Sequence, residues 1–248
     1  MTVEIEAKKL KKIVEVVKAA IGSNAADLDI TLRPTGATLD MLDPANVLYI
    51  HMDLSSDDDS ISKWDISEKR CISLDIDKTL AVCKLSTGLI SCKLTEDGST
   101  VIMTTGHITR RMSISYLEET ARIPKCAASD DAVQVKVTPD MLLKVLKYGA
   151  DISPEVIISM TGNTMTASMQ GATDEMCSVS DCDEVIHPSN EKVDVILFAN
   201  YLYNFLKSLP PIVMTMFLEE NMPLIIEVTD KGVHLKYVLA PCIKETDL

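Results

Sequence analysis

Lysine side chains recur along the first predicted helix, and ammonium groups at that spacing are suited to binding anions. Lys8, Lys11, Lys12 and Lys18 lie opposite an apolar stripe that repeats every three or four residues over 7–21. Lysines without neighbouring arginines or aromatic rings suit contact with a phosphate backbone and not the reading of bases. Such contact would be weak, independent of base sequence and sensitive to salt. For one helix alone, a solvated surface is the plainer interpretation.

The distribution of charge over the whole chain favours the anion-binding interpretation. Helices are predicted at residues 7–22, 76–84, 139–148 and 199–208, and together they carry a formal charge of +7. The chain as a whole carries −13, so everything outside these helices carries −20. A protein that gathers positive charge on its helices while the remainder is strongly negative has two electrostatic faces.

Residues for catalysis or metal binding form no recognisable motif. The sequence has no nucleophile elbow, no glycine-rich phosphate loop and no His-Glu-x-x-His pair. Asp57, Asp58 and Asp59 lack the spaced ligands of a calcium loop and are interpreted as a solvated turn. The seven cysteines include no Cys-x-x-Cys pair and are interpreted as free, mostly buried thiols in a reducing cytosol. We expect no enzymatic activity, no cofactor and no metal site.

The elements that position the lysines occur twice. Shifting the chain by about 124 residues places residues 85–94 on residues 209–218, and each half then shows two helices among short alternating segments. Many antiparallel strands with few short helices predict an α+β fold. The alternation stops after residue 116 and resumes at residue 133, which predicts domains at 1–116 and 133–248 joined by a linker at 117–132. With no signal peptide and no long apolar run, we expect no export and no membrane span.

Four segments carry a resemblance to a known family. The motif Pro-Leu-x-x-Glu at 223–227, the motif Leu-x-Tyr-x-Leu-Ala-Pro at 235–241, and the segments 35–47 and 201–207 resemble DNA sliding clamps of the PCNA type, in an archaeal version. The resemblance covers essentially the whole chain. It implies the DNA clamp fold, with two similar domains of antiparallel sheet and two helices each. It also implies a homotrimeric ring of six domains that encircles double-stranded DNA and tethers replication and repair enzymes to it.

The resemblance assigns three sets of residues to function. The lysines that match DNA-facing positions are Lys8, Lys11, Lys12, Lys18, Lys78, Lys84, Lys144, Lys147 and Lys207. The pocket for a short partner peptide matches Leu42, Asn46, Ile123, Pro124, Pro223, Val238, Leu239, Ala240 and Pro241. The edge strands that join subunits match Arg110, Arg111, Met112, Ile114 and Tyr116 in the first domain and Glu175, Cys177, Val179 and Asp181 in the second.

The partners implied by the resemblance are DNA polymerase, the clamp loader, a flap nuclease and DNA ligase, each bound through a short peptide motif. Such a clamp would be cytoplasmic and nucleoid-associated in an archaeon, or nuclear in a eukaryote. Two alternatives stay open. A subunit of a heterotrimeric or checkpoint-type clamp would fail to self-associate. A small-molecule enzyme with a duplicated α+β fold would need clustered ionisable groups in a polar pocket, and the sequence offers none in linear form.

Overall fold

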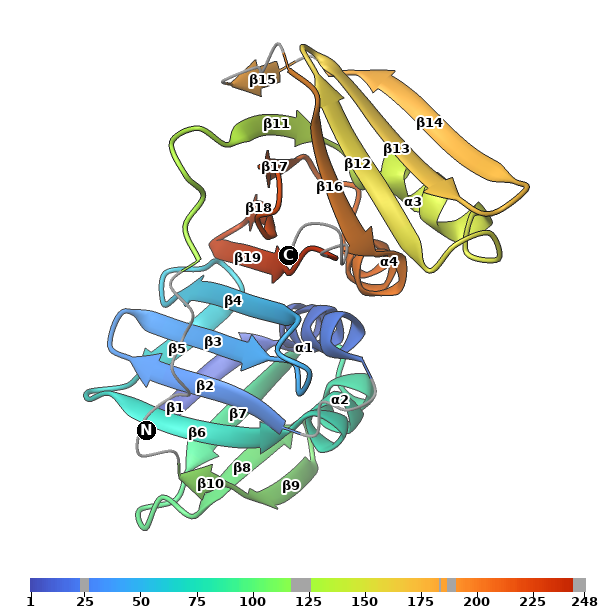
Figure 1. Ribbon diagram of the computed structural model, residues 1–248. Coiled ribbons are helices and arrows are strands. Elements are labelled where there is room, and N and C mark those ends of the chain that lie inside the picture. The colour runs from blue at the N-terminus through green and yellow to red at the C-terminus, as the bar shows by residue number, and fades with distance from the viewer. Residues whose placement is uncertain (23–26, 117–125, 183, 187–190, 243–248) are drawn as a thin grey trace. The chain divides into compact units, whose positions relative to one another are not determined.

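The computed structural model describes residues 1–22, 27–116, 126–182, 184–186 and 191–242, which form two compact units (Figure 1). Unit 1 is drawn from Met1–Pro44, Ile50–Pro124 and Thr229–Leu235, and unit 2 from Ala45–Tyr49, Lys125–Val228 and Lys236–Leu248. The predicted linker at 117–132 lies outside the described residues as far as residue 125, and residues 126–132 belong to unit 2.

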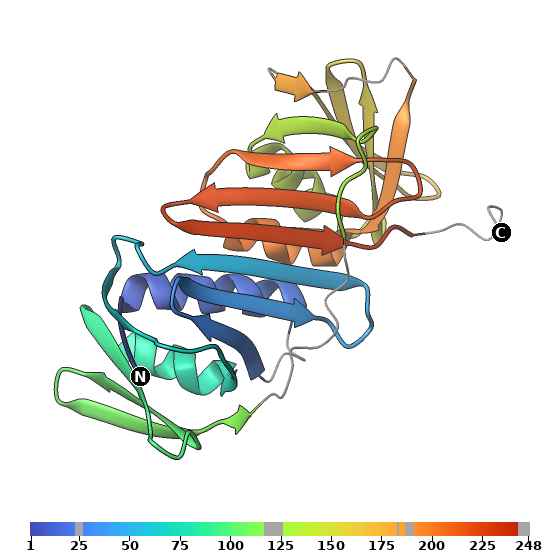
Figure 2. The ribbon, with the colours of Figure 1, turned by 90° about the vertical axis from the view of Figure 1, so that its left-hand side faces the viewer.

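Unit 1 contains two antiparallel sheets and two helices. One sheet has the strand order β5 (Ile61–Asp65), β1 (Thr2–Glu6), β7 (Leu89–Leu94), β8 (Thr100–Thr105) and β9 (Ile108–Ser113). The other has the order β10 (Ser115–Tyr116), β6 (Arg70–Asp75), β2 (Asp27–Arg33), β3 (Gly36–Leu42) and β4 (Leu48–Ser55). The helices α1 (Ala7–Ile21) and α2 (Ile76–Leu85) pack side by side and contact strands of both sheets (Figures 1 and 2).

Unit 2 repeats this plan with its own two sheets and two helices. One sheet has the order β14 (Glu175–Asp181), β13 (Thr164–Gln170), β12 (Glu155–Thr161) and β16 (Val193–Phe198). The other has the order β19 (Val233–Leu239), β18 (Leu224–Asp230), β17 (Met214–Leu218), β11 (Val133–Val137) and β15 (Glu184–Ile186). The helices α3 (Pro139–Tyr148) and α4 (Ala199–Ser208) pack against each other (Figure 1).

The helices form where the apolar period and the end signals predict them. The apolar stripe of α1 is buried, and the helix stops at Gly22, whose φ of 81° lies in the region that favours glycine. The first turn of α2 is capped by Asp75, whose carboxylate accepts the N–H of Lys78 at 2.8 Å. Proline opens α3, where a missing N–H costs nothing. All four predicted helices are therefore confirmed, with ends within one residue.

The strands differ from the prediction where alternation is short or broken. β5 and β15 are too short and too exposed to stand out in the sequence. The edge strand to which the resemblance assigned Arg110 through Tyr116 divides in two at Ile114, whose N–H donates to the carbonyl of Ser99 at 3.0 Å. β9 stays in the sheet with β8, whereas β10 pairs with β6 in the other sheet. A change of sheet within three residues leaves no sign in the pattern of side chains.

Neither a membrane-spanning helix nor a metal-binding cluster is found among the described residues. Within these residues, no helix is long and apolar enough to cross a membrane. The same residues contain no group of three or more His, Cys, Asp or Glu side chains placed to hold a metal ion.

Candidate functional site

The lysines of α1 divide between the exposed surface and nearby carboxylates of unit 1. Lys8 and Lys12 are exposed. Lys11 lies 3.6 Å from the carboxylate of Glu15, and Lys18 pairs with Asp77 on α2. Ion pairs this exposed contribute about 0.5 kcal/mol or less, so either ammonium can exchange its carboxylate for another anion at little cost.

Lys9 departs from the other lysines of α1 because it turns into unit 1. Its Nζ lies 2.9 Å from Asp58 Oδ2 and donates to the carbonyl of Lys231 at 2.8 Å. Burial opposes ionisation of Asp58, but hydrogen bonds from Ser60 and Lys9 outweigh it and lower the pKa of that carboxyl group. The interpretation of residues 57–59 as a solvated turn is thus wrong for Asp58. A buried carboxylate at this turn needs a cation, and Lys9 supplies it.

Of the two lysines of α2, one is paired with a carboxylate and the other is exposed at the helix end. Lys78 Nζ lies 2.6 Å from Asp75, and the hydrogen bond from this ammonium is the main reason that the pKa of Asp75 is lowered. Lys84, in the last turn of the helix, is exposed. It lies where the partial negative charge of the helix C-terminus favours a cation.

The lysines of α3 and α4 are exposed, and two of the three lie beside aromatic rings. Lys144, Lys147 and Lys207 are all exposed on α3 and α4. Lys147 Nζ lies 5.1 Å from the ring centre of Tyr148, and Lys207 Nζ lies 5.4 Å from that of Tyr203. The sequence-based description of lysines without aromatic neighbours is therefore wrong for Lys147 and Lys207. Tyr203 is four residues from Lys207 and meets it across one turn of the helix, whereas Tyr148 directly follows Lys147 and was visible in the sequence.

The predicted subunit-joining strand of unit 2 lies at a sheet edge. Among the described strands, β14 ends its sheet, with β13 on its inner side. Val179 is 64 % exposed and Cys177 is exposed, so apolar area faces outward along this strand. The end residues Glu175 and Asp181 accept hydrogen bonds from Gln170 and Thr164 on β13. An apolar edge with acidic ends is a surface that another strand can extend.

The corresponding edge of unit 1 is β9, and its residues divide differently from the prediction. Arg111 is exposed, and Ile108 is 46 % exposed. Arg110 donates to the carbonyl of Lys78 on α2 at 3.3 Å, so its guanidinium group is tied to its own unit. Met112 is only 3 % exposed and packs in the core of unit 1, which removes it from the outer surface. Tyr116 lies on β10, away from this edge.

Four of the nine residues of the predicted peptide pocket lie around residues 42–46 and 123–124. Leu42 is exposed at the end of β3 in unit 1. Asn46, in unit 2, is exposed in a turn with a φ of 57°. Ile123 and Pro124 lie outside the described residues.

The C-terminal half of the predicted pocket is more buried than expected. Val238 and Leu239 are 4 % and 0 % exposed, because both pack in the interior of unit 2 and not on its surface. The N–H of Ala240 donates to the carbonyl of Val47 at 2.8 Å, so it is not available to a peptide. Pro223 and Pro241 are half-buried and keep part of their rings exposed.

An apolar hollow of about 150 Å³ lies in unit 2 beside Pro223. Behind it, Val238 packs with Tyr49 and Ile225, and Phe217 packs against that cluster. The segment that borders the hollow is held by a hydrogen bond of 2.6 Å from Ser129 Oγ to Glu219. The hollow is lined by Cys126, Ala127, Ala128, Ala132, Phe217, Glu219, Met222, Pro223 and Ile225. Sequence reasoning found only Pro223 of this set, because the others come from three separate segments.

A charged cluster on β3 and β4 of unit 1 was also missed at the level of sequence. His51 places Nδ1 2.7 Å from Asp40 and Nε2 2.8 Å from Asp53. The hydrogen bond with Asp40 is the largest influence on the ring, burial opposes it, and Asp53 adds to it, so the pKa of His51 is raised to about 9. The imidazolium holds the two strands together across their outer face.

Comparisons with known proteins agree with this architecture. No family model matches the chain. The DNA polymerase sliding clamp of Picrophilus torridus is 25% identical over 175 residues, which are 69% of this chain and 67% of that protein. The DNA polymerase sliding clamp of Archaeoglobus fulgidus is 22% identical over 237 residues, which are 94% of this chain and 96% of that protein.

Solved structures extend the likeness to the whole fold. The structure of Archaeoglobus fulgidus PCNA with the C-terminal region of FEN-1 bound matches with a TM-score of 0.83 at 20% identity, covering 98% of this chain and 99% of that one. The PCNA2–PCNA3 complex of Sulfolobus tokodaii matches with a TM-score of 0.78 at 12% identity, covering 97% and 99%. The predicted DNA clamp fold and the resemblance to sliding clamps are confirmed.

Proposed function

We propose that this chain, which has the fold of PCNA-type sliding clamps, is itself a DNA sliding clamp that increases the processivity of replication and repair enzymes. The observation that carries the proposal is the placement of charge. On a chain with a net charge of −13, each of the two units presents a pair of packed helices with exposed lysines. A binding role of this kind needs no catalytic group.

The lysines suit a contact that permits sliding. Each ammonium meets a phosphate as a point charge and reads no base, so the attraction is the same at every position along a duplex. Lys11, Lys18 and Lys78 already have carboxylate partners, which lowers what a phosphate contact gains. The resulting weak attraction suits a ring that holds DNA by enclosing it, because strong contacts would oppose sliding.

We propose that the ring closes head to tail as a homotrimer, with β9 of one chain beside β14 of the next. Both strands lie at sheet edges and expose apolar side chains, Ile108 on β9 and Val179 on β14. Arg111 on β9 and the acidic ends of β14 carry opposite charges. Pairing the two edges would also cover strands that otherwise invite aggregation.

We further propose that partner enzymes bind through short peptides with an apolar anchor, placed at the hollow in unit 2. The hollow combines an apolar floor, formed by Phe217 and Ile225, with an exposed rim residue, Met222. The PCNA of Archaeoglobus fulgidus binds the C-terminal region of FEN-1. DNA polymerase, the clamp loader, a flap nuclease and DNA ligase are the partner classes we expect.

Solution mass is the first test of the proposal. Three chains of 27.2 kDa give about 82 kDa by light scattering after size exclusion, and this mass should persist on dilution. A constant mass of one chain would contradict the homotrimer. Recovery of the trimer mass only after a second clamp subunit is added would favour the heterotrimeric alternative.

Topological retention tests encirclement itself. The protein is threaded onto linear duplex DNA through open ends, the ends are then blocked by a bulky protein, and the salt concentration is raised. A ring should stay on blocked DNA and leave open-ended DNA, because salt screens the lysine contacts but cannot open a closed path. Equal loss from both DNAs would show that the chain only binds the DNA surface.

A further inference from the structure

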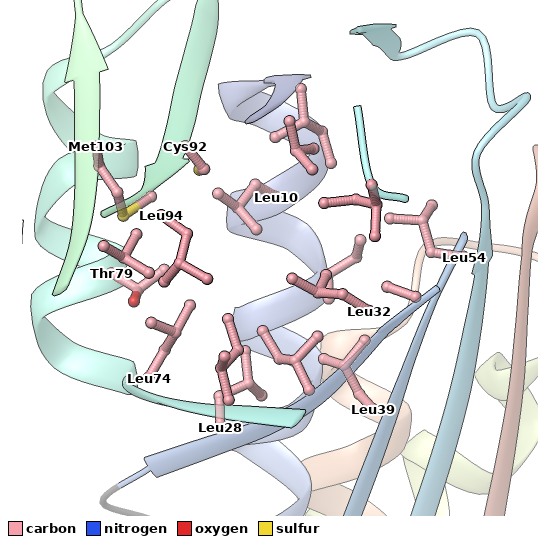
Figure 3. Close-up of a pocket in the computed structure, with 18 of the residues that line it drawn as sticks. Leu10, Leu28, Leu32, Leu39, Leu54, Leu74, Thr79, Cys92, Leu94 and Met103 are labelled. Atoms are coloured by element: carbon pink, nitrogen blue, oxygen red, sulfur yellow. The ribbon is translucent and has the colours of Figure 1, made fainter. Parts of the chain in front are cut away.

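Unit 1 contains an internal apolar cavity of about 110 Å³ (Figure 3). Its walls come from α1, α2 and both sheets of the unit. Leu10 contributes from α1, Thr79 from α2, Leu39 from β3 and Met103 from β8. The labelled side chains in Figure 3 surround one common space, although they come from segments far apart in the sequence.

The lining offers almost nothing for water to bind. Its side chains are hydrocarbon or sulfur except for Trp64 and the hydroxyl of Thr79. The Thr79 hydroxyl donates to the carbonyl of Asp75 at 2.7 Å, and Trp64 Nε1 donates to the carbonyl of Arg33 at 2.9 Å. A buried water needs two to four polar partners, so this cavity stays dry.

The equivalent helix positions in unit 2 explain why the space exists. α2 and α4 have ten residues each and hold equivalent places in the two units, so Thr79 corresponds to Leu202 and Val82 to Phe205. Leu202 and Phe205 are completely buried, and the Phe205 ring stacks on Tyr237 at 3.9 Å. Thr79 lines the cavity and is smaller than Leu202, so unit 1 leaves volume unfilled at this position. Val82 is likewise smaller than Phe205 but does not line the cavity.

One edge of the cavity is less buried than the rest. Met1, Trp64 and Leu94 line it and are half-buried, whereas Leu39 and Met103 on other walls are fully buried. Met1 is held there by its carbonyl, which accepts the N–H of Leu94 at 3.2 Å. Opening this edge requires movement of the chain terminus and one indole ring, and no strand has to separate.

We propose that this cavity is a binding site for a small apolar molecule, up to about the size of an aromatic ring. Dry apolar cavities of roughly 150 Å³ bind benzene or xenon, because an apolar guest leaves water and gains dispersion contacts with walls that lack partners. The cavity in unit 1 is somewhat smaller, so xenon and benzene bracket the size of guest that it admits. The site is separate from the lysines, the edge strands and the hollow in unit 2, and it does not depend on the proposed function.

The test uses the full-length protein with ¹³C-labelled methionine methyl groups, and it adds xenon gas or benzene as probes. The methyl resonances of Met1 and Met103 should shift with saturation, while those of Met165 and Met216 in the packed core of unit 2 should not. The chain has one tryptophan, so fluorescence of Trp64 gives a second readout at the cavity edge. Benzene should also raise the midpoint of thermal unfolding by a few degrees, as any ligand of the native state does.

Matched variants separate this cavity from other sites. Thr79→Leu introduces the residue of unit 2 and should abolish the shifts, and Ala37→Val, on the β3 wall, should weaken them. Thr79→Val removes the same hydroxyl without adding volume and should bind as the natural protein does. Absence of any shift with both probes would overturn the proposal, and so would equal shifts in the natural protein and in Thr79→Leu.

Discussion

Unit 1 and unit 2 follow the same order of strands and helices, but they fill their interiors differently. In unit 2 the space under the helices is occupied by Leu202, Phe205 and Tyr237, none of which is exposed. In unit 1 a cavity lies beside Thr79, which takes the position of Leu202, and the smaller Val82 takes that of Phe205. The two units thus share the arrangement of strands and helices but differ in how side chains fill their interiors.

The same contrast extends to the charged surfaces. Unit 1 carries five lysines on the 15-residue α1 and two on α2; Lys11, Lys18 and Lys78 pair with carboxylates of these helices or beside them, and Lys9 is paired with the buried Asp58. Unit 2 uses two ten-residue helices with three exposed lysines, two of which lie beside tyrosine rings. The helices of the two units would therefore meet a DNA phosphate with lysines in different surroundings, carboxylates in unit 1 and tyrosine rings in unit 2.

The largest expected effect comes from emptying the interior of unit 2. Phe205→Ala should lower the free energy of unfolding by about 3–5 kcal/mol, because it removes a buried ring and leaves a cavity. Val82→Ala, at the equivalent position of unit 1, should cost roughly 1–2 kcal/mol. Urea unfolding measures both, with Asn200→Ala on the exposed side of α4 as a control. Equal losses at the two positions would mean that the units are packed alike.

The edges of the two units should respond together if they meet in a ring. Val179→Glu on β14 should weaken self-association about a hundredfold, since it places a charge in an apolar contact beside acidic residues. Ile108→Glu on β9 should act in the same direction. Light scattering over a dilution series measures the effect. Val213→Glu, an exposed valine elsewhere in unit 2, is the matched control, and an equal effect there would remove the case for the edges.

The His51 cluster should make the stability of unit 1 depend on pH. The folded pKa of about 9 exceeds the unfolded value of 6.5, so the stabilisation is complete below pH 6.5 and is lost as the pH rises through 9. Because the ring is 25% exposed, we expect no more than about 2 kcal/mol. Unfolding free energies at pH 6 and pH 10 should differ less in His51→Gln. An unchanged difference would contradict the imidazolium assignment.

The smallest effects concern the lysines, taken unit by unit. Lys12→Ala with Lys84→Ala, and separately Lys147→Ala with Lys207→Ala, should each lower DNA affinity about threefold. A plot of the logarithm of the binding constant against the logarithm of the salt concentration should also become shallower. Its slope should fall in magnitude by up to about 0.9 for every phosphate that is no longer neutralised. The control is Lys63→Ala with Lys93→Ala, which removes two exposed lysines from strands of unit 1. It changes the net charge by the same amount and should have no such effect. A loss of affinity confined to one unit would show that only that unit faces DNA.

By itself, the sequence determined the features that depend on neighbours within a few residues. The stripe on α1, the proline that opens α3 and the alternation in most strands predicted the helices within one residue and the α+β class. The segregation of lysines onto helices followed from the same period. Local period and end signals are enough here because hydrogen bonding within a helix and burial of one face both repeat along the chain.

Only the tertiary structure decided what depends on residues distant in sequence. Asp58 is buried with Lys9 as its cation, Met112 faces inward, and β10 leaves the sheet of β9 after one residue. The hollow beside Pro223 and the cavity beside Thr79 are assembled from separate segments, and their size is the volume that those segments fail to fill. An unfilled volume depends on how several distant segments pack together, so it cannot be predicted from a local pattern of residues.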